Sequence, residues 1–309
     1  MSAPTVDLDT GRPVAGRLIR SELLKIRTTN TWWIFLIGAF AATAVALATW
    51  IITGNIRIDD AQEAAGRTFD PPEGAPDFVV ELERQQFELS QDISRTLHSV
   101  TAEIYTSGQF FGLMFALLIG VLLITNEYHH QTATATFLAT PHRTHAILGK
   151  LATAMIGAGF FWVFATAVSV AAGATFLAIK GYGPQLDQWP VIRAVLLNGL
   201  AYGLWGMVGV GLGVLIRSQI AAVLVGAIVY VIGGLVVQQL VFGLAILLDW
   251  RWLLDVSVLW PGIASQVMIA PEPPWPGSPV WWVGALVLVG YAVVLGGIGT
   301  LLTRRRDIT

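Results

Sequence analysis

The chain has 309 residues, of which 55% are hydrophobic and only 12% are charged, and its formal net charge is −2. Such a composition excludes an ordinary soluble protein and predicts an integral membrane protein whose core forms in lipid. Because cysteine is absent, disulfides, thiol chemistry and cysteine-based metal sites are excluded as well.

The N-terminal part predicts a helix that lies on the membrane surface. In residues 17–27 apolar side chains recur at helical spacing, while Arg20, Lys25 and Arg27 face away from them. A basic amphipathic helix of this kind lies in the interface, where its cations meet anionic lipid head groups. Residues 1–31 are therefore expected to form a cytoplasmic tail and an interfacial helix, with no removable signal peptide.

Six hydrophobic runs are long enough to cross a bilayer, because a helical span needs roughly 20 mostly apolar residues. We place these spans at 32–53, 107–126, 151–179, 193–216, 219–248 and 280–303. Trp32 and Trp33 are expected to mark the inner head-group level of the first span, as aromatic belts do. The predicted fold is thus an all-α membrane domain at 32–303, followed by a short cytoplasmic tail at 304–309.

The distribution of Lys and Arg predicts the orientation of the spans. Eleven of these residues flank span ends on the side that holds both termini and the 126–150 loop, against seven on the other side. Positive residues near span ends accumulate in the cytoplasm, so both termini are expected there, in a multi-pass protein of the plasma membrane. The opposite, outer side carries a long acidic segment at 54–106.

That outer segment predicts a large helical insertion. Residues 54–76 contain several prolines and glycines and are typical of a loop. After them, Asp77 is expected to cap a helix whose apolar stripe continues to the second span. The stripe could pack on the outer ends of other spans, contact a substrate or lipid, or pair with a partner subunit.

A polar loop at 127–145 lies between the second and third spans. Glu127 stands at a span end, where a carboxylate needs either water or a basic partner such as Arg143, Lys150 or a group of another protein. Threonines, among them Thr132, can cap a short helix here, and Pro141 would end it. Four histidines in the loop raise the possibility of a metal site. Because adjacent histidines point to different sides of a helix, we expect a hydrated loop and no metal site.

The stretch before the last span, residues 249–279, predicts a pair of short outer helices. Its apolar run at 253–268 is broken by Trp260, Pro261 and Gly262, and is too short to cross a bilayer. We therefore expect interfacial or re-entrant half-helices on the outer side.

The fourth span carries glycines at the spacing that lets helices approach closely. Gly199 precedes Gly203 by four residues, and Gly209 precedes Gly213 by the same interval. Small residues so spaced support either a moving seam or static close packing.

The sequence lacks the residues that several kinds of chemistry require. It contains no phosphate-binding Gly-x-x-x-x-Gly-Lys-Ser/Thr run, and its spans contain no deep carboxylate of the kind that ion-coupled carriers need. The chain is therefore not expected to be an enzyme or to hold a cofactor of its own. Energy for any transport must come from a partner.

The 126–150 stretch resembles the permease subunits of type-2 ABC exporters, and the likeness extends over the whole chain. The residues that carry it are Glu127, Tyr128, Thr132, Pro141, Arg143 and Lys150. The resemblance implies that residues 127–145 form a coupling helix that seats on a separate ATPase through these side chains. Two departures stand out: residues 129–131 replace a basic residue and a glycine, and the 54–106 segment is longer than a minimal outer loop.

The same resemblance implies the partners of the chain. These are ABC ATPase subunits, which would hold the ATP and Mg²⁺, a similar permease in a homodimer or heterodimer, and membrane lipid, but no nucleic acid. The basic helix at 17–27 would either anchor the chain only or also touch the ATPase. Trp260, Pro261 and Gly262 resemble the outer gate of these exporters.

Two functions remain open from the sequence. The first is an exporter permease for an amphipathic or hydrophobic cargo, such as a drug, lipid or lipopeptide, because the spans are rich in aromatic residues, Leu and Gly and poor in charge. The second is a non-transporting scaffold, immunity or sensor protein that uses residues 54–106 to bind an outer partner.

Overall fold

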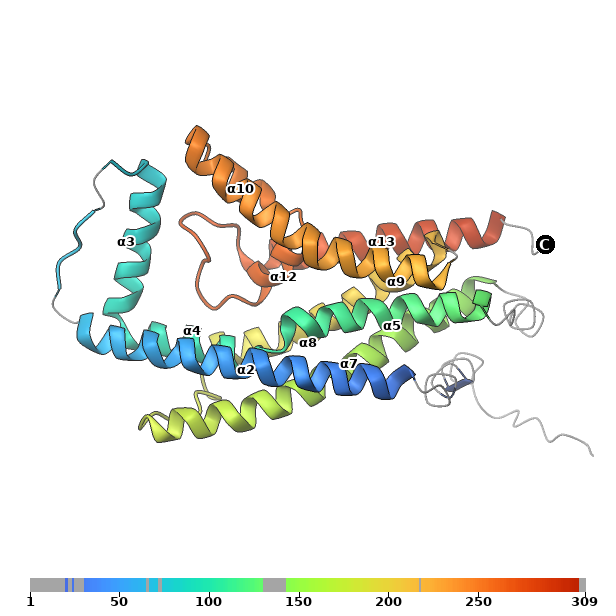
Figure 1. Cartoon of the computed structure of the whole chain (residues 1–309), viewed down its shortest axis with the longest axis horizontal. Coiled ribbons are helices and arrows are strands. Elements are labelled where there is room, and N and C mark those ends of the chain that lie inside the picture. Colours follow the sequence, from blue (N-terminus) through green and yellow to red (C-terminus); the bar gives the residue numbers. More distant parts are fainter. Residues whose placement is uncertain are drawn as a thin grey trace, which may run out of the picture.

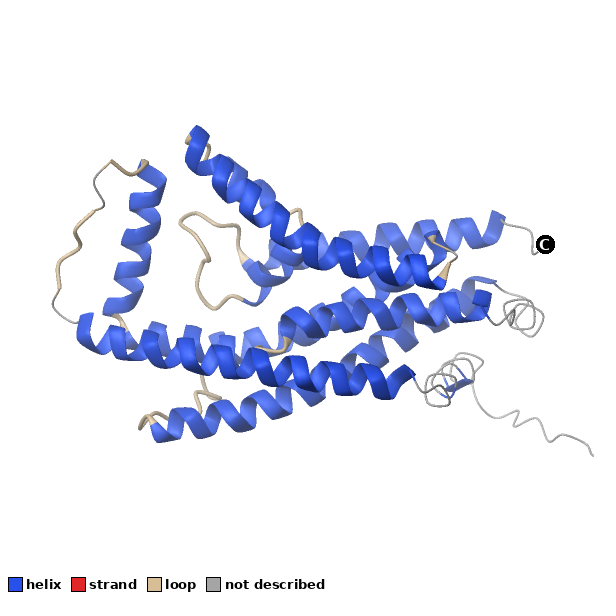
Figure 2. Cartoon of the chain, in the orientation of Figure 1, coloured by secondary structure: helices blue, strands red, loops and turns tan. Residues whose placement is uncertain are grey.

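The computed structural model describes residues 20–21, 24, 31–64, 67–71, 74–129, 143–216 and 218–305. Within these ranges all regular structure is helical, as Figure 2 shows, which confirms the predicted all-α fold. The elements are α2 (Thr31–Ala64), α3 (Asp77–Gln91), α4 (Ile93–Tyr105), α5 (Gln109–His129), α7 (Arg143–Ile179), α8 (Trp189–Leu215), α9 (Gln219–Ile228), the π-helical turn η1 (Val229–Gly233), α10 (Gly234–Leu248), α11 (Trp252–Ser257), α12 (Pro261–Ile269) and α13 (Trp281–Arg305).

Six stretches of the described chain are long and apolar enough to cross a membrane, as the sequence predicts. They are Leu36–Glu63, Ile93–Glu127, Ile147–Ile179, Trp189–Leu215, Gln219–Leu248 and Trp281–Gly299. Most of these helices run along the long axis of the molecule, whereas α3 crosses it at one end (Figure 1). We call the end of the bundle where α5 ends and α7 begins the inner end, following the predicted orientation, and the end at α3 the outer end.

Helix α8 lies at the centre of the bundle and packs on α5, α7 and α13. Glycines allow its backbone to touch that of α5: a Cβ at Gly209 would overlap the carbonyl oxygen of Leu117, and one at Gly120 would overlap that of Gly206. A Cβ at Gly213 would lie 2.9 Å from the carbonyl oxygen of Val121. The close approach predicted for Gly209 and Gly213 is thus confirmed, and α5 is the helix that they approach.

The first helix is longer than predicted. A loop was expected from residue 54, yet α2 continues to Ala64. Gly54, Ile58 and Ala61 are buried at helical spacing, and a Cβ at Gly54 would lie only 2.6 Å from Val100 of α4. The polar residues that suggested a loop instead find partners on neighbouring elements: Arg57 pairs with Glu103, and Lys180 Nζ lies 2.7 Å from Asp59. Tertiary contacts therefore extend the helix beyond its apolar part.

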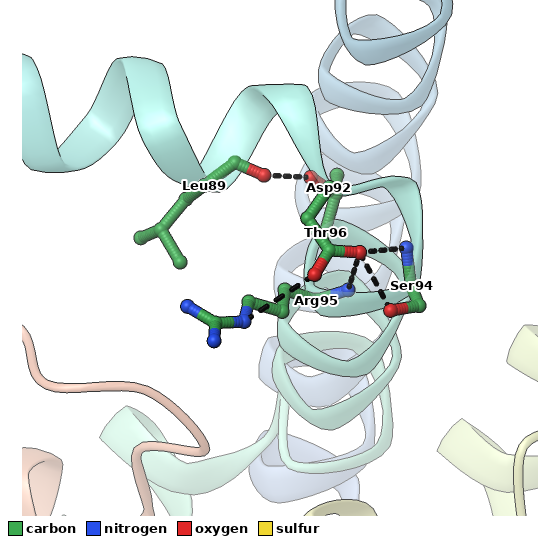
Figure 3. A network of polar contacts seen from close by, with 5 residues as sticks. All are labelled: Leu89, Asp92, Ser94, Arg95 and Thr96. Atoms are coloured by element: carbon green, nitrogen blue, oxygen red, sulfur yellow. Dashed lines mark hydrogen bonds and ion pairs between the residues drawn. The ribbon is translucent and has the colours of Figure 1, made fainter.

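The prediction of one continuous helix from Asp77 to the second span is wrong. Helix α3 ends at Gln91, and Asp92, with extended backbone angles (φ −107°, ψ 95°), starts the separate helix α4. Its carboxylate accepts hydrogen bonds from the Ser94 and Arg95 amides at 3.0 and 3.4 Å and from the Ser94 hydroxyl at 2.6 Å (Figure 3). Asp92 therefore caps the N-terminus of α4, and the chain changes direction at this residue.

Two further details of this segment differ from expectation. Asp77 is the first residue of α3, which follows Pro76, and no side chain caps the helix there. A second break, the turn at residues 106–108, separates α4 from α5. The apolar stretch Ile93–Glu127 is therefore made of two helices, α4 and α5.

Candidate functional site

A buried ion pair joins α5 and α7 at the inner end of the bundle. Lys150 Nζ lies 2.8 Å from Glu127 Oε1, and the two side chains are 3% and 7% exposed, respectively. The same ammonium group donates a hydrogen bond to the carbonyl oxygen of Leu123 at 3.2 Å. Glu127 lies in the last turn of α5, while Lys150 lies in the second turn of α7.

The local electrostatics explain why Lys150 takes this position. The C-terminal end of a helix carries partial negative charge, which a nearby cation stabilises and a carboxylate such as Glu127 does not. The positive charge of Lys150 offsets both the negative charge of the Glu127 carboxylate and the partial negative charge at the end of α5. Because both groups are withdrawn from water, removing one of them would deprive the other buried charge of this partner, at a cost of about 3–5 kcal/mol. The pair therefore joins the two helices at a position where replacing one partner alone is costly.

This arrangement decides among the interpretations that the sequence left open for Glu127. The hydrated alternative is wrong, because the residue is only 5% exposed. Of the candidate partners, Lys150 contacts Glu127, whereas the side chain of Arg143 is not among those described. The role of the pair in coupling to an ATPase remains a prediction.

The other predicted coupling residues are only partly covered. Thr132 and Pro141 lie outside the described residues, and for Tyr128 and Arg143 only the backbone is described, in the last turn of α5 and at the start of α7. The structure thus brings Glu127 and Lys150 together.

A second polar contact at the inner end escaped the sequence analysis. Gln219 Nε2, at the start of α9, donates a hydrogen bond of 2.9 Å to Asn126 Oδ1, one residue before Glu127. The sequence does contain a sign of this contact. Asn126 directly precedes Glu127, and Gln219 opens the fifth span after a very short turn, so both amide side chains lie at the inner ends of their spans. The inner end of α5 is therefore tied to both α7 and α9.

The predicted interfacial anchor lies mostly outside the described residues. The side chains of Lys25, Arg27 and Trp32 are among those not described, and Arg20 is exposed. Trp33 lies in the first turn of α2, with 53% of its surface exposed. This exposure at the inner end of a span is compatible with the head-group position expected for it.

The predicted outer break is present between α11 and α12. Trp260 precedes α12 with extended backbone, and Pro261 occupies the first turn of that helix, where its missing N–H costs nothing. A Cβ at Gly233 of η1 would lie 2.7 Å from the Trp260 ring, so the indole packs directly on the π-helical turn. Gly262 lies next to the same indole. The residues predicted to form an outer gate therefore meet the fifth span, while their gating role remains a prediction.

An aromatic and polar cluster holds this outer break against the centre of the bundle. Trp205 Nε1 donates to Ser265 Oγ of α12 at 2.9 Å, and its ring lies 4.8 Å from that of Tyr230. The Tyr230 hydroxyl in turn donates to the carbonyl oxygen of Phe110 at 2.7 Å. The sequence analysis did not single out these residues. Because π-helical turns are rare and are frequent at functional sites, Tyr230 in η1 is a further residue of functional interest.

Comparison with known proteins assigns the chain to a family. The sequence profile of a family described as "ABC-2 family transporter protein" matches residues 19–308, which is nearly the entire chain. No curated protein matches the chain.

Proposed function

The chain belongs to the ABC-2 family of transporter proteins, and from this premise we propose that it exports an amphipathic or hydrophobic cargo across the plasma membrane. Membership of this family makes the chain a multi-pass membrane permease that pairs with an ABC ATPase subunit. In this proposal the ATPase binds ATP and Mg²⁺, and two permease chains, identical or similar, line the cargo path.

The observation that carries the proposal is the buried pair of Glu127 and Lys150. It links the two helices that flank the 127–145 loop, which we expect to seat on the ATPase. Since α5 and α7 both pack on α8, a force applied to that loop would reach the centre of the bundle. The hydrogen bond between Gln219 and Asn126 would carry the same movement to α9.

The test is purification of the tagged chain from the membranes of its native host, identification of any ABC ATPase that accompanies it, and measurement of ATP turnover per complex. Glu127→Ala and Lys150→Ala are compared with Glu63→Ala and Arg67→Ala, which break an exposed outer pair whose side chains are 72% and 63% exposed. We expect both inner variants to lower complex yield or ATP turnover and both outer variants to leave them unchanged.

The possible results separate two claims. If no ATPase accompanies the wild-type chain, the exporter proposal fails. If an ATPase is present but all four variants behave like the wild type, the inner pair has no role in coupling. The alternative of a non-transporting scaffold or sensor is disfavoured, because the family match extends over residues 19–308 and not over a part of the chain.

A further inference from the structure

A cavity of about 720 Å³ opens at the outer end of the bundle. Residues of α2, α3, α4, the start of α5, the end of α12 and the segment that follows it line this outer cavity. Its volume falls in the range of sites that bind small molecules, roughly 300–1,000 Å³. The outer insertion supplies part of the wall, so the cavity depends on the segment whose role the sequence left open.

Part of the lining of the outer cavity lies at the expected outer boundary of the hydrocarbon. Gln109 and Phe110 of α5 line it, and Glu127 lies 18 residues further along the chain. At about 1.5 Å per residue this distance is about 27 Å, close to the roughly 30 Å of a bilayer core. With Glu127 at the inner boundary, the cavity therefore occupies the outer head-group level.

The charged groups that line the outer cavity are mainly acidic. Asp60, Glu103 and Glu272 contribute three carboxylates, whereas Arg57 is the single Lys or Arg among the lining residues. Arg57 is paired with Glu103. The remaining two carboxylates give the lining a net negative charge.

One further cation, Arg193 of α8, lies near the wall of the cavity and attracts Glu272. It does not line the cavity, and its guanidinium donates to the carbonyl oxygens of Ala270 and Pro271 at 2.8 and 3.2 Å. Arg193 therefore holds the segment after α12 in place and offsets part of the charge of Glu272. Asp60 also lines the cavity and is exposed.

Helix α3 forms the outer wall and is joined to the opposite wall. Gln86, Leu89 and Ser90 of α3 line the cavity, and Gln85 Nε2 donates to the carbonyl oxygen of Pro273 at 3.0 Å. The lining also contains two aromatic side chains, Trp50 and Phe110, beside polar residues such as Gln109. The outer cavity thus combines carboxylates with aromatic surface.

We propose that the outer cavity binds an amphiphile with a cationic, ammonium-type head group. The head group lies near Asp60 and Glu272, and the apolar chain lies against Trp50 and Phe110, whose rings also attract cations. This inference rests on the proposed export of an amphipathic cargo and specifies the chemical class of that cargo. It also assigns α3 the role of a wall of the binding site.

The experiment measures binding of decyltrimethylammonium to the full chain in nanodiscs of zwitterionic lipid, by calorimetric titration with empty nanodiscs subtracted. Decyl sulfate, with an anionic head group and the same chain length, is the comparison. We expect saturable binding of the cation alone, weakened by salt. Asp60→Asn combined with Glu272→Gln should weaken binding about fivefold, which corresponds to about 1 kcal/mol for the two charges together. Asp187→Asn, at an exposed position outside the cavity, should have no effect.

A second pair of variants tests the proposal even if the double variant fails to fold. Gln86 is exposed on α3 and lines the cavity, so Gln86→Lys and Gln86→Glu change the charge of the wall without disturbing the core. The lysine should weaken binding and the glutamate should strengthen it. Equal binding of the sulfate, or affinities that do not change with any of these charges, would overturn the proposal. Because no ATPase is present in this assay, failure here leaves the co-purification result standing, and the reverse also holds.

Discussion

The ammonium group of Lys150 lies 2.8 Å from the carboxylate of Glu127, in a position where neither side chain is more than 7% exposed. The two residues are separated by 23 positions in the chain and belong to different helices. Their contact joins the end of α5 to the start of α7.

The buried pair predicts an asymmetric response to substitution. Glu127→Leu alone should destabilise the purified chain by about 3 kcal/mol or more, because it removes the carboxylate that lies 2.8 Å from the buried Lys150 ammonium. The double variant Glu127→Leu with Lys150→Met should be more stable than that single variant, since no charge remains buried. Thermal unfolding in detergent, followed by fluorescence-detected size-exclusion chromatography, measures both. A double variant less stable than the single would contradict the assignment.

The contact of α5 with α8 predicts that replacing Gly209 lowers the stability of the chain. Gly209→Ala would place a Cβ on the backbone of Leu117, so the helices must separate, at a cost of at least about 1–3 kcal/mol. Gly159→Ala is the matched control, because a Cβ there meets nothing within 4 Å. Both variants are compared by the same thermal unfolding measurement. Equal stability would show that the two helices do not touch as described.

The contact between Trp260 and η1 predicts a compensating pair of substitutions. Gly233→Ala would bring its Cβ within 2.7 Å of the Trp260 ring, so the indole must move and transport should fall. Trp260→Phe, which removes the part of the ring nearest Gly233, should restore part of that loss when combined with Gly233→Ala. Gly243→Ala on α10 meets nothing within 4 Å and should behave like the wild type. Purely additive effects of the two substitutions would argue against a direct contact.

The cap at Asp92 predicts that the corner between α3 and α4 depends on pH. The pKa of Asp92 lies below its usual value, chiefly because the Ser94 hydroxyl donates to the carboxylate, with the Arg95 and Ser94 amides adding to this. A depressed folded-state pKa contributes stability above the ordinary pKa, and this contribution is lost as the pH falls through the folded value. The capping hydrogen bonds of Asp92 should therefore be stable at neutral pH and weaken only in strong acid.

Hydrogen exchange at the amides of Ser94 and Arg95 measures this effect, after correction for the intrinsic exchange rate at each pH. Asp92→Ala should exchange faster at neutral pH, whereas Asp92→Asn, which can still cap the helix, should keep most of the protection and lose its pH dependence. Unchanged exchange in Asp92→Ala would show that the corner is held by other contacts.

Much of the architecture could be predicted because it follows from local pattern. Hydrophobic runs of sufficient length identified the six spans, and the break at Trp260, Pro261 and Gly262 predicted two short outer helices, since a proline is confined to the first turn of a helix. Glycine spacing predicted the close approach at Gly209, although it did not identify α5 as the partner. For the inner loop, the sequence indicated that Glu127 needs a partner and offered Lys150 among the candidates.

What the sequence by itself determined is therefore the number and kind of the membrane helices, because these depend on residues that are near one another in the chain. Only the tertiary structure decided which distant groups meet. It extended α2 by pairing Arg57 with Glu103 across 46 residues, selected Lys150 for Glu127, and brought α3 against Pro273 to complete the outer cavity. Such contacts are set by how whole helices pack, and a polar residue carries no local sign of the partner that it will find.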